Sequence, residues 1–80
     1  MKEMHVRLAS FQEVRDLVAI ASKMNFPVRI ADGRREGNAK SLMNIFGLNL
    51  RQTLIVQLDC DEDDFEVFRT LAGRFEVMSE

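Results

Sequence analysis

The stretch Gly37-Asn38-Ala39-Lys40-Ser41-Leu42-Met43-Asn44-Ile45 decides the fold of this chain of 80 residues. Its polar beginning is typical of an edge strand, which we predict over residues 35–40. Ser41 is a favoured N-cap, because its hydroxyl can accept a hydrogen bond from a free amide of a first helical turn. The stretch therefore predicts a short edge strand that leads into a short apolar helix, which ends before Gly47.

The residues upstream of this stretch predict a strand followed by an amphipathic helix. Apolar and polar side chains alternate over residues 4–8, which indicates a half-buried strand. Ser10 and Glu13 have the spacing of a capping box, so we expect a helix to begin after Ser10 and to end near Asn25. The apolar residues of this helix recur at helical spacing and form one predicted stripe: Val14, Leu17, Val18, Ala21 and Met24.

The remaining segments predict a hairpin, a fourth strand and a last helix. A second strand around residues 28–30 leads into Asp32-Gly33, a pair typical of hairpin turns. Residues 54–58 alternate as a fourth strand. The acidic residues over 61–64 favour the positive end of a helix dipole, and Gly73 weakens the end of that helix by about 1 kcal/mol relative to Ala. The predicted buried stripe of this helix comprises Phe65, Phe68, Leu71, Ala72 and Phe75.

These segments follow the order β-α-β-β-α-β-α within one predicted domain over residues 1–80. Alternating strands leave one face of a sheet solvated, and each helix needs an apolar face to cover, so we expect two layers. The predicted fold class is therefore α+β. It is an open-faced β-sandwich with a four-stranded, mainly antiparallel sheet covered by three helices on one face.

The composition excludes several classes of function. Hydrophobic residues make up 46% of the chain and its net charge is −2, which is typical of a globular domain. Such a charge provides no basic field for nucleic acid or for a membrane surface. No segment approaches the roughly 20 apolar residues of a membrane span. The single cysteine, Cys60, fits a reducing compartment, so we expect a cytoplasmic protein, and we expect no cofactor.

The central stretch resembles a known signature. The run Asp32-Gly33-Arg34-Arg35-Glu36-Gly37-Asn38-Ala39-Lys40-Ser41-Leu42-Met43 is similar to the N-G-K…(N/S)-A-K-S-(I/L)-(M/F) run of HPr, the small phosphocarrier of the bacterial sugar phosphotransferase system. Further similarity lies in Leu48-Asn49-Leu50 and in Thr53-Leu54-Ile55-Val56. The resemblance extends without a gap from about Ser10 to the end of the chain. It implies the HPr-like fold and protein partners from the phosphotransferase or carbon-regulation systems.

The chain departs from the family at the carrier site. The family has L-H-x-R-P-A at the start of its first helix, where this chain has Ala9 to Val14. Ser10 occupies the position of the phosphohistidine, Gln12 that of the arginine and Glu13 that of the proline. Phosphoryl transfer needs the imidazole nucleophile, and free helix amides and the arginine hold the transferred dianion. The resemblance therefore implies a member without a catalytic residue, which is not an enzyme.

Ser10 and His5 each have two interpretations. Ser10 could replace the lost acceptor, but a serine hydroxyl is a poor nucleophile at neutral pH without a base beside it. We favour a capping role for Ser10. His5 could be a displaced carrier, but it falls on the polar side of the first strand. We favour an ordinary exposed histidine.

Ser41 also has two interpretations, which are compatible. It resembles the serine that an ATP-dependent HPr kinase phosphorylates in some bacteria, and it is a favoured N-cap. Phosphate at a helix N-terminus is favoured by the helix dipole.

No metal site is predicted. Asp59, Asp61 and Asp63 have the spacing of a calcium loop, but Asp64 stands where such a loop needs glycine, and Thr70 where it needs glutamate. Arg34 and Arg35 could bind an anion; we favour solvated turn residues.

A partner surface is predicted beside the first helix. Four residues of the short helix are more apolar than so short an element can bury: Leu42, Met43, Ile45 and Phe46. Together with Phe11 and Gln12 they form the expected docking site, which in the family binds partner proteins. The leading hypothesis is a non-catalytic regulatory or adaptor protein. The alternatives are a phosphocarrier with an atypical acceptor and an unrelated interaction module. We expect a monomer, with strand exchange at the polar edge strand as a route to a homodimer.

Overall fold

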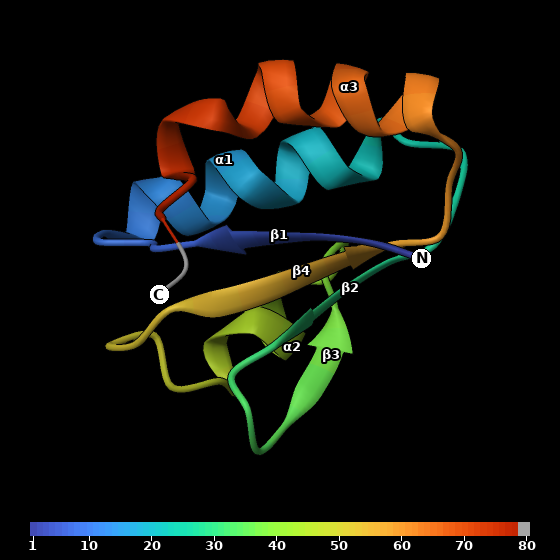
Figure 1. Cartoon of the computed structure of the whole chain (residues 1–80). Helices are drawn as coiled ribbons and strands as arrows, with labels where there is room; N and C mark the ends of the chain where they lie inside the picture. Colours follow the sequence, from blue (N-terminus) through green and yellow to red (C-terminus); the bar gives the residue numbers. More distant parts are fainter. Residues whose placement is uncertain (79–80) are drawn as a thin grey trace.

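The computed structural model describes residues 1–78, so the last two residues of the predicted domain, 79–80, lie outside the described residues. Figure 1 shows helices and strands in the predicted order. The elements are β1 (Lys2–Val6), α1 (Phe11–Ser22), β2 (Val28–Ala31), β3 (Glu36–Asn38), α2 (Leu42–Phe46), β4 (Leu54–Leu58) and α3 (Glu62–Ala72). A 3-10 turn, Gly73–Phe75, follows α3.

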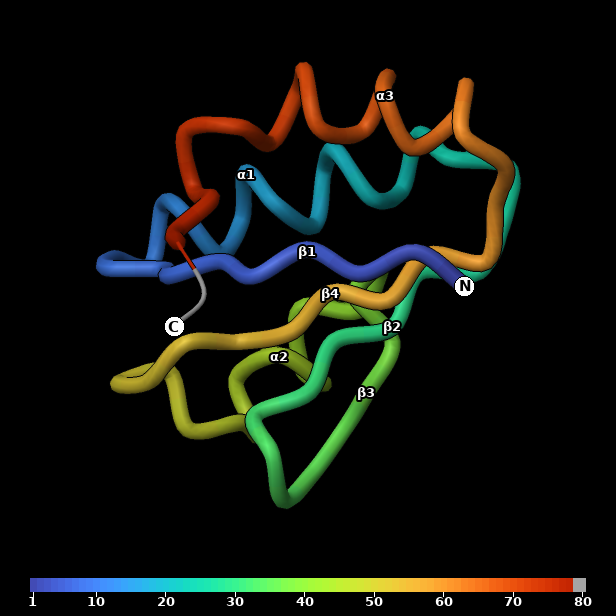
Figure 2. The backbone as a smooth tube through the Cα atoms, viewed as in Figure 1, coloured from blue at the N-terminus to red at the C-terminus, as the bar shows by residue number. Residues whose placement is uncertain are grey.

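The sheet has the strand order β1-β4-β2-β3, and every pairing in it is antiparallel. The fourth strand in the chain thus lies between the first and the second. In Figures 1 and 2, α1 and α3 lie side by side along the β1 half of the sheet, and α2 lies behind β2 and β3. The predicted α+β fold, with a four-stranded antiparallel sheet and three helices, is confirmed.

Strand alternation separates a buried face of the sheet from an open one. Val56 lies between Met4 of β1 and Ile30 of β2, and all three are at most 1% exposed. The neighbours Ile55 and Gln57 on the other face are half-buried. The helices complete the core with Val14, Leu17, Ala21, Ile45, Phe68, Ala72 and Phe75.

Two strand boundaries differ from the prediction. β1 spans residues 2–6 rather than 4–8, because its ladder with β4 ends at Val6. The chain beyond it turns to the C-terminal segment, where the Arg7 amide donates to the Phe75 carbonyl at 2.9 Å. β3 spans only residues 36–38, because the Asn38 side chain accepts from the Lys40 amide and closes a turn.

The predicted stripe of α3 is wrong at Leu71, which is 42% exposed. The inward side of α3 is occupied by Phe68 and Ala72, both fully buried, and Leu71 lies on the flank. The helix also ends at Ala72, so Gly73 is its C-cap and not an interior residue. Within residues 1–78, no helix has both the length and the apolar character needed to cross a bilayer.

A glycine sets the distance between α2 and β3. Gly37 is buried in β3, and a Cβ placed on it would lie 2.9 Å from the Cβ of Asn44 in α2. The Asn44 side chain accepts a hydrogen bond from the Asn38 amide at 2.9 Å. The short helix is therefore held closely against the edge strand.

Candidate functional site

The start of α1 is a capping box in which Glu13 bonds the amide of Ala9, one residue before the N-cap Ser10. The Ser10 hydroxyl accepts a hydrogen bond from the Glu13 amide at 3.2 Å, and the Glu13 carboxylate accepts one from the Ala9 amide at 2.7 Å. The predicted capping role of Ser10 is confirmed. A carboxylate thus sits at the helix N-terminus, where it opposes the binding of a second anion.

Gln12, at the position of the family's arginine, is engaged within the helix. Its side-chain amide donates to Asp16 at 2.9 Å, and Asp16 also accepts from Arg74 at 2.6 Å. The hydrogen bond from Gln12, and then the one from Arg74, hold the pKa of Asp16 below its usual range. Gln12 is therefore part of a chain of contacts that joins α1 to the C-terminal segment.

His5 is not part of the start of α1. It pairs with Ile55 in the β1–β4 ladder, on the face of the sheet opposite the buried Met4 and Val6. It is half-buried rather than freely exposed. The sheet thus separates His5 from the helix N-terminus.

Ser41 caps α2 as predicted. Its hydroxyl accepts a hydrogen bond from the Asn44 amide at 3.3 Å, and Gly47 is the C-cap. The neighbouring Lys40 ammonium donates to the Met24 carbonyl at 2.9 Å and so ties the start of α2 to the end of α1. The Ser41 side chain is half-buried.

The structure brings two of the predicted partner residues together. The rings of Phe11 and Phe46 stack with their centroids 5.3 Å apart, although the residues lie far apart in the chain. Phe11 is 56% exposed and Phe46 40% exposed, and Met43 of the same helix is 79% exposed. Leu42 is half-buried. Ile45 corrects the prediction, because it points into the core and is 0% exposed, so its side chain is closed to a partner.

A groove of about 310 Å³ adjoins the two phenylalanines. Leu8, Val14, Leu50 and Arg51 also line this groove, and the sequence analysis did not predict any of the four to be part of the docking site. The guanidinium of Arg15 also lies over the Phe11 ring, 5.8 Å from its centroid. These residues come from four separate segments, so only the folded chain reveals their proximity. We call Phe11, Met43, Phe46 and Leu50 the apolar surface.

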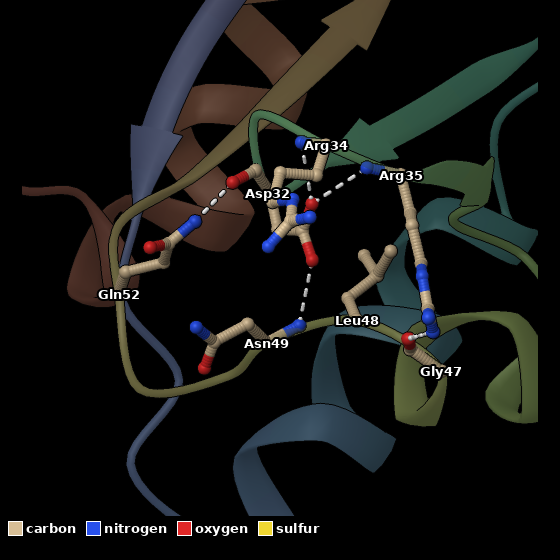
Figure 3. A pocket seen from close by; sticks show the side chains of 7 residues that line it. All are labelled: Asp32, Arg34, Arg35, Gly47, Leu48, Asn49 and Gln52. Carbon is tan, nitrogen blue, oxygen red and sulfur yellow. Dashed lines mark hydrogen bonds between the residues drawn. The ribbon is translucent and has the colours of Figure 1, made fainter.

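A polar clamp holds the hairpin against the loop that follows α2. Figure 3 shows Asp32 at its centre: the carboxylate accepts hydrogen bonds from the amides of Arg34, Arg35 and Asn49 at 2.7 to 2.8 Å. The Asp32 carbonyl accepts one from Gln52. The Arg35 amide, and then those of Asn49 and Arg34, lower the pKa of Asp32 to about 2.

One arginine of this clamp, Arg35, contacts the backbone after α2. The Arg35 guanidinium donates to the Gly47 carbonyl at 3.2 Å, and the Asp32 carboxylate lies in the same hollow. The polar groups that line this hollow therefore hold the hairpin against the loop that follows α2. At the start of α3, Asp61 is an N-cap whose carboxylate accepts from the Asp64 amide at 2.9 Å.

These features define a class of protein: a small open-faced sandwich that presents a helix start and a short neighbouring helix on one surface. Residues 2–76 match the family model described as the PTS HPr component phosphorylation site. The chain therefore belongs to the HPr family, the phosphocarrier family of the phosphotransferase system.

Two solved structures are similar in fold. HPr-C-His from Thermoanaerobacter tengcongensis superposes with a TM-score of 0.71 at 22% identity, covering 91% of this chain and 92% of its own. The histidine-containing phosphocarrier protein of Mycoplasma gives a TM-score of 0.68 at 16% identity, covering 88% and 90%. No curated protein matches this chain in sequence.

Proposed function

We propose that this protein is a regulatory or adaptor member of the HPr family that docks partner proteins and carries no phosphoryl group on its first helix. The observation that carries the proposal is the capping box of Ser10 and Glu13. The Glu13 carboxylate lies where a phosphoryl group would need positive potential. The Ser10 hydroxyl accepts a hydrogen bond from an amide, and within residues 1–78 it forms no hydrogen bond to a base.

The apolar surface supports a docking role. Aromatic residues are enriched at protein–protein interfaces, and the exposed rings of Phe11 and Phe46 form one stacked platform. Met43 adds a flexible side chain that can adapt to different partner shapes. Partner proteins of the phosphotransferase or carbon-regulation systems in the cytoplasm are the proposed occupants.

Ser41 is the proposed regulatory residue. It lies at the start of the helix that presents Met43 and Phe46, so a phosphate there would add negative charge beside the apolar surface. That charge would strengthen contact with a basic partner and weaken contact with an acidic one.

The first experiment is intact mass after two parallel incubations, one with Enzyme I and phosphoenolpyruvate and one with HPr kinase and ATP. We expect one phosphoryl group with the kinase alone. Ser41→Ala and Ser41→Asn should both abolish this phosphorylation. Because asparagine is also a favoured N-cap, a loss of phosphorylation in Ser41→Asn cannot be attributed to loss of the cap. Phosphorylation by Enzyme I would contradict the proposal and would favour an atypical carrier.

A second experiment tests docking directly. Met43→Glu places a charge on the most exposed residue of the apolar surface and should weaken binding to HPr-binding regulatory proteins at least tenfold, measured by calorimetry. Val67→Glu is the matched control, because Val67 is also exposed but lies on α3. Equal losses of partner affinity in Met43→Glu and Val67→Glu would show that the partner does not bind specifically at the apolar surface.

A further inference from the structure

Two arginines adjoin the apolar surface without a carboxylate partner. The guanidinium of Arg15 lies 5.8 Å from the centroid of the Phe11 ring, and Arg51 lines the groove beside that ring. Both arginines are exposed. Within residues 1–78, neither of them forms an ion pair. Both positive charges are therefore available to a group from another molecule.

The carboxylates near these arginines are already engaged. The Glu13 carboxylate accepts a hydrogen bond from the Ala9 amide at 2.7 Å. Asp16 accepts one from Gln12 at 2.9 Å and one from Arg74 at 2.6 Å, and its charge is offset by that of Arg74. Gln12, at the position of the family's arginine, contributes no charge. The cations of this surface therefore come from the side of α1 and from the loop after α2.

The groove between these cations is apolar. Its floor is formed by Leu8 and Val14, which are 4% and 1% exposed, and its sides by Phe11, Phe46 and Leu50. Its volume of about 310 Å³ lies at the lower end of the range of ligand pockets. The groove therefore fits a single anchor side chain of a partner better than a large ligand.

Acidic residues of the chain are concentrated at the opposite end of the helical layer. Residues 59–66 contain six carboxylates and no basic residue: Asp59, Asp61, Glu62, Asp63, Asp64 and Glu66. Figure 1 shows that the start of α3 lies beside the end of α1, whereas Phe11 lies at the start of α1. A chain with a net charge of −2 thus has free cations beside its apolar surface.

We propose that Arg15 and Arg51 determine which partners bind the apolar surface, by selecting a protein segment in which carboxylates flank an apolar anchor side chain. The anchor enters the groove, and the carboxylates contact the two guanidinium groups. Guanidinium suits this role because its planar fork can bind a carboxylate through two hydrogen bonds. This inference deepens the proposed docking function and rests on it.

An acidic protein segment fits this surface better than a nucleic acid does. Nucleic-acid binding depends on the neutralisation of many phosphates by a broad basic patch. Here two arginines flank one apolar groove, and the acidic residues 59–66 would repel a long polyanion.

The test is an NMR titration of the whole chain with three blocked synthetic peptides. The first has a Leu-Phe pair between two Glu-Glu pairs, the second has Lys in place of each Glu, and the third has Ala-Ala in place of Leu-Phe. We expect the first to shift the amide signals of α1 and α2 with a Kd on the order of 1 mM. The second and third should bind about fivefold more weakly or worse.

Arginine variants identify the cations that select the peptide. Arg15→Gln and Arg51→Gln should each weaken binding of the first peptide about two- to fivefold, as expected for exposed ion pairs. Arg29→Gln is the matched control. Arg29 is also exposed, but it lies between the buried Val28 and Ile30 in β2, so its side chain is on the face of the sheet away from the helices. This control should bind like the wild type.

The outcomes separate this inference from the docking role. Equal binding of the acidic and basic peptides, or unchanged affinity in both Arg15→Gln and Arg51→Gln, would overturn the inference. A loss of binding in Met43→Glu in the same titration would still support docking at the apolar surface. Failure of all three peptides to bind the wild type at millimolar concentration would also overturn the inference, and calorimetry with regulatory proteins tests the docking role independently. Tighter binding of a single-stranded oligonucleotide than of the acidic peptide would identify a polyanion site instead.

Discussion

At the scale of single residues, Glu13 is the basis for the proposal that this chain carries no phosphoryl group on α1. Its carboxylate reaches back to the Ala9 amide, while its own amide donates to Ser10. The same two contacts stabilise the start of α1 and place negative charge at that end of the helix. One residue thus contributes to stability and, under the proposed function, disfavours a phosphoryl group at this end of the helix.

The Asp32 clamp predicts a pH dependence of stability. Backbone hydrogen bonds lower the pKa of Asp32 from its ordinary value of 3.8 to about 2 in the folded protein. The charged carboxylate therefore stabilises the fold above about pH 4, and this contribution is lost as the pH falls toward 2. In urea unfolding, Asp32→Asn should be less stable than the wild type at neutral pH, and the difference should shrink below pH 4. Asp59→Asn, at an exposed position, should follow the wild-type curve.

Two glycines predict opposite effects of the same substitution. In Gly37→Ala the new methyl group would lie 2.9 Å from the Asn44 Cβ, so we expect a loss of about 1–3 kcal/mol and a displacement of α2. Gly73→Ala meets nothing within 4 Å and Gly73 has helical backbone angles, so it should add about 0.4–1 kcal/mol. Urea titration of both variants measures the two effects. Equal free energies of unfolding for Gly37→Ala and Gly73→Ala would show that α2 moves away from the new methyl group at no cost in stability.

At the scale of elements, the cap of α1 can be tested apart from any carrier role. Ser10→Ala removes the acceptor for the Glu13 amide and should cost about 1 kcal/mol of unfolding free energy. Ser10→Asp keeps an acceptor at the N-cap and should retain stability within about 0.5 kcal/mol. A Ser10→Asp variant as unstable as Ser10→Ala would contradict the capping role.

Local signals allowed most elements to be predicted from sequence. Capping at Ser10 and Ser41 and the Asp32-Gly33 turn, where Gly33 has a φ of 96°, each depend on neighbouring residues only. Strand ends and the burial of Leu71 depend on distant segments, so the pattern misplaced them. A helical stripe indicates a face of the helix, but it does not set how far around the helix the neighbouring elements extend.

The candidate site could be predicted only in part for the same reason. Phe11 was identified from its place at the start of the first helix. Met43 and Phe46 were identified because the short helix has more apolar residues than it can bury, and Ile45 was included although it is buried. The stacking of Phe11 on Phe46, and the contributions of Leu50 and Arg51 to the groove, arise from the packing of α1 against α2 and the following loop. No spacing in the sequence encodes such contacts.

At the scale of the whole molecule, β4 carries the largest share of the buried sheet. Leu58 lies between Lys2 of β1 and Val28 of β2 and is 0% exposed. Leu58→Ala should cost about 2–5 kcal/mol, because it leaves a cavity that three elements share. Leu71→Ala, at 42% exposure, should cost less than about 1 kcal/mol. Thermal unfolding of both variants compares them directly, and similar melting temperatures would contradict the assignment of Leu58 to the core.

The strand order also determines when the sheet can form during synthesis. β1 is synthesised before the other strands of the sheet, yet it pairs with β4, which is made after α1, the β2–β3 hairpin and α2. A nascent chain that stops before Leu54 can form the local hairpin, but it leaves the apolar residues of β1 without a partner strand. Closure of the sheet therefore waits until β4 has been synthesised. Until then the apolar residues of β1 are exposed to aggregation.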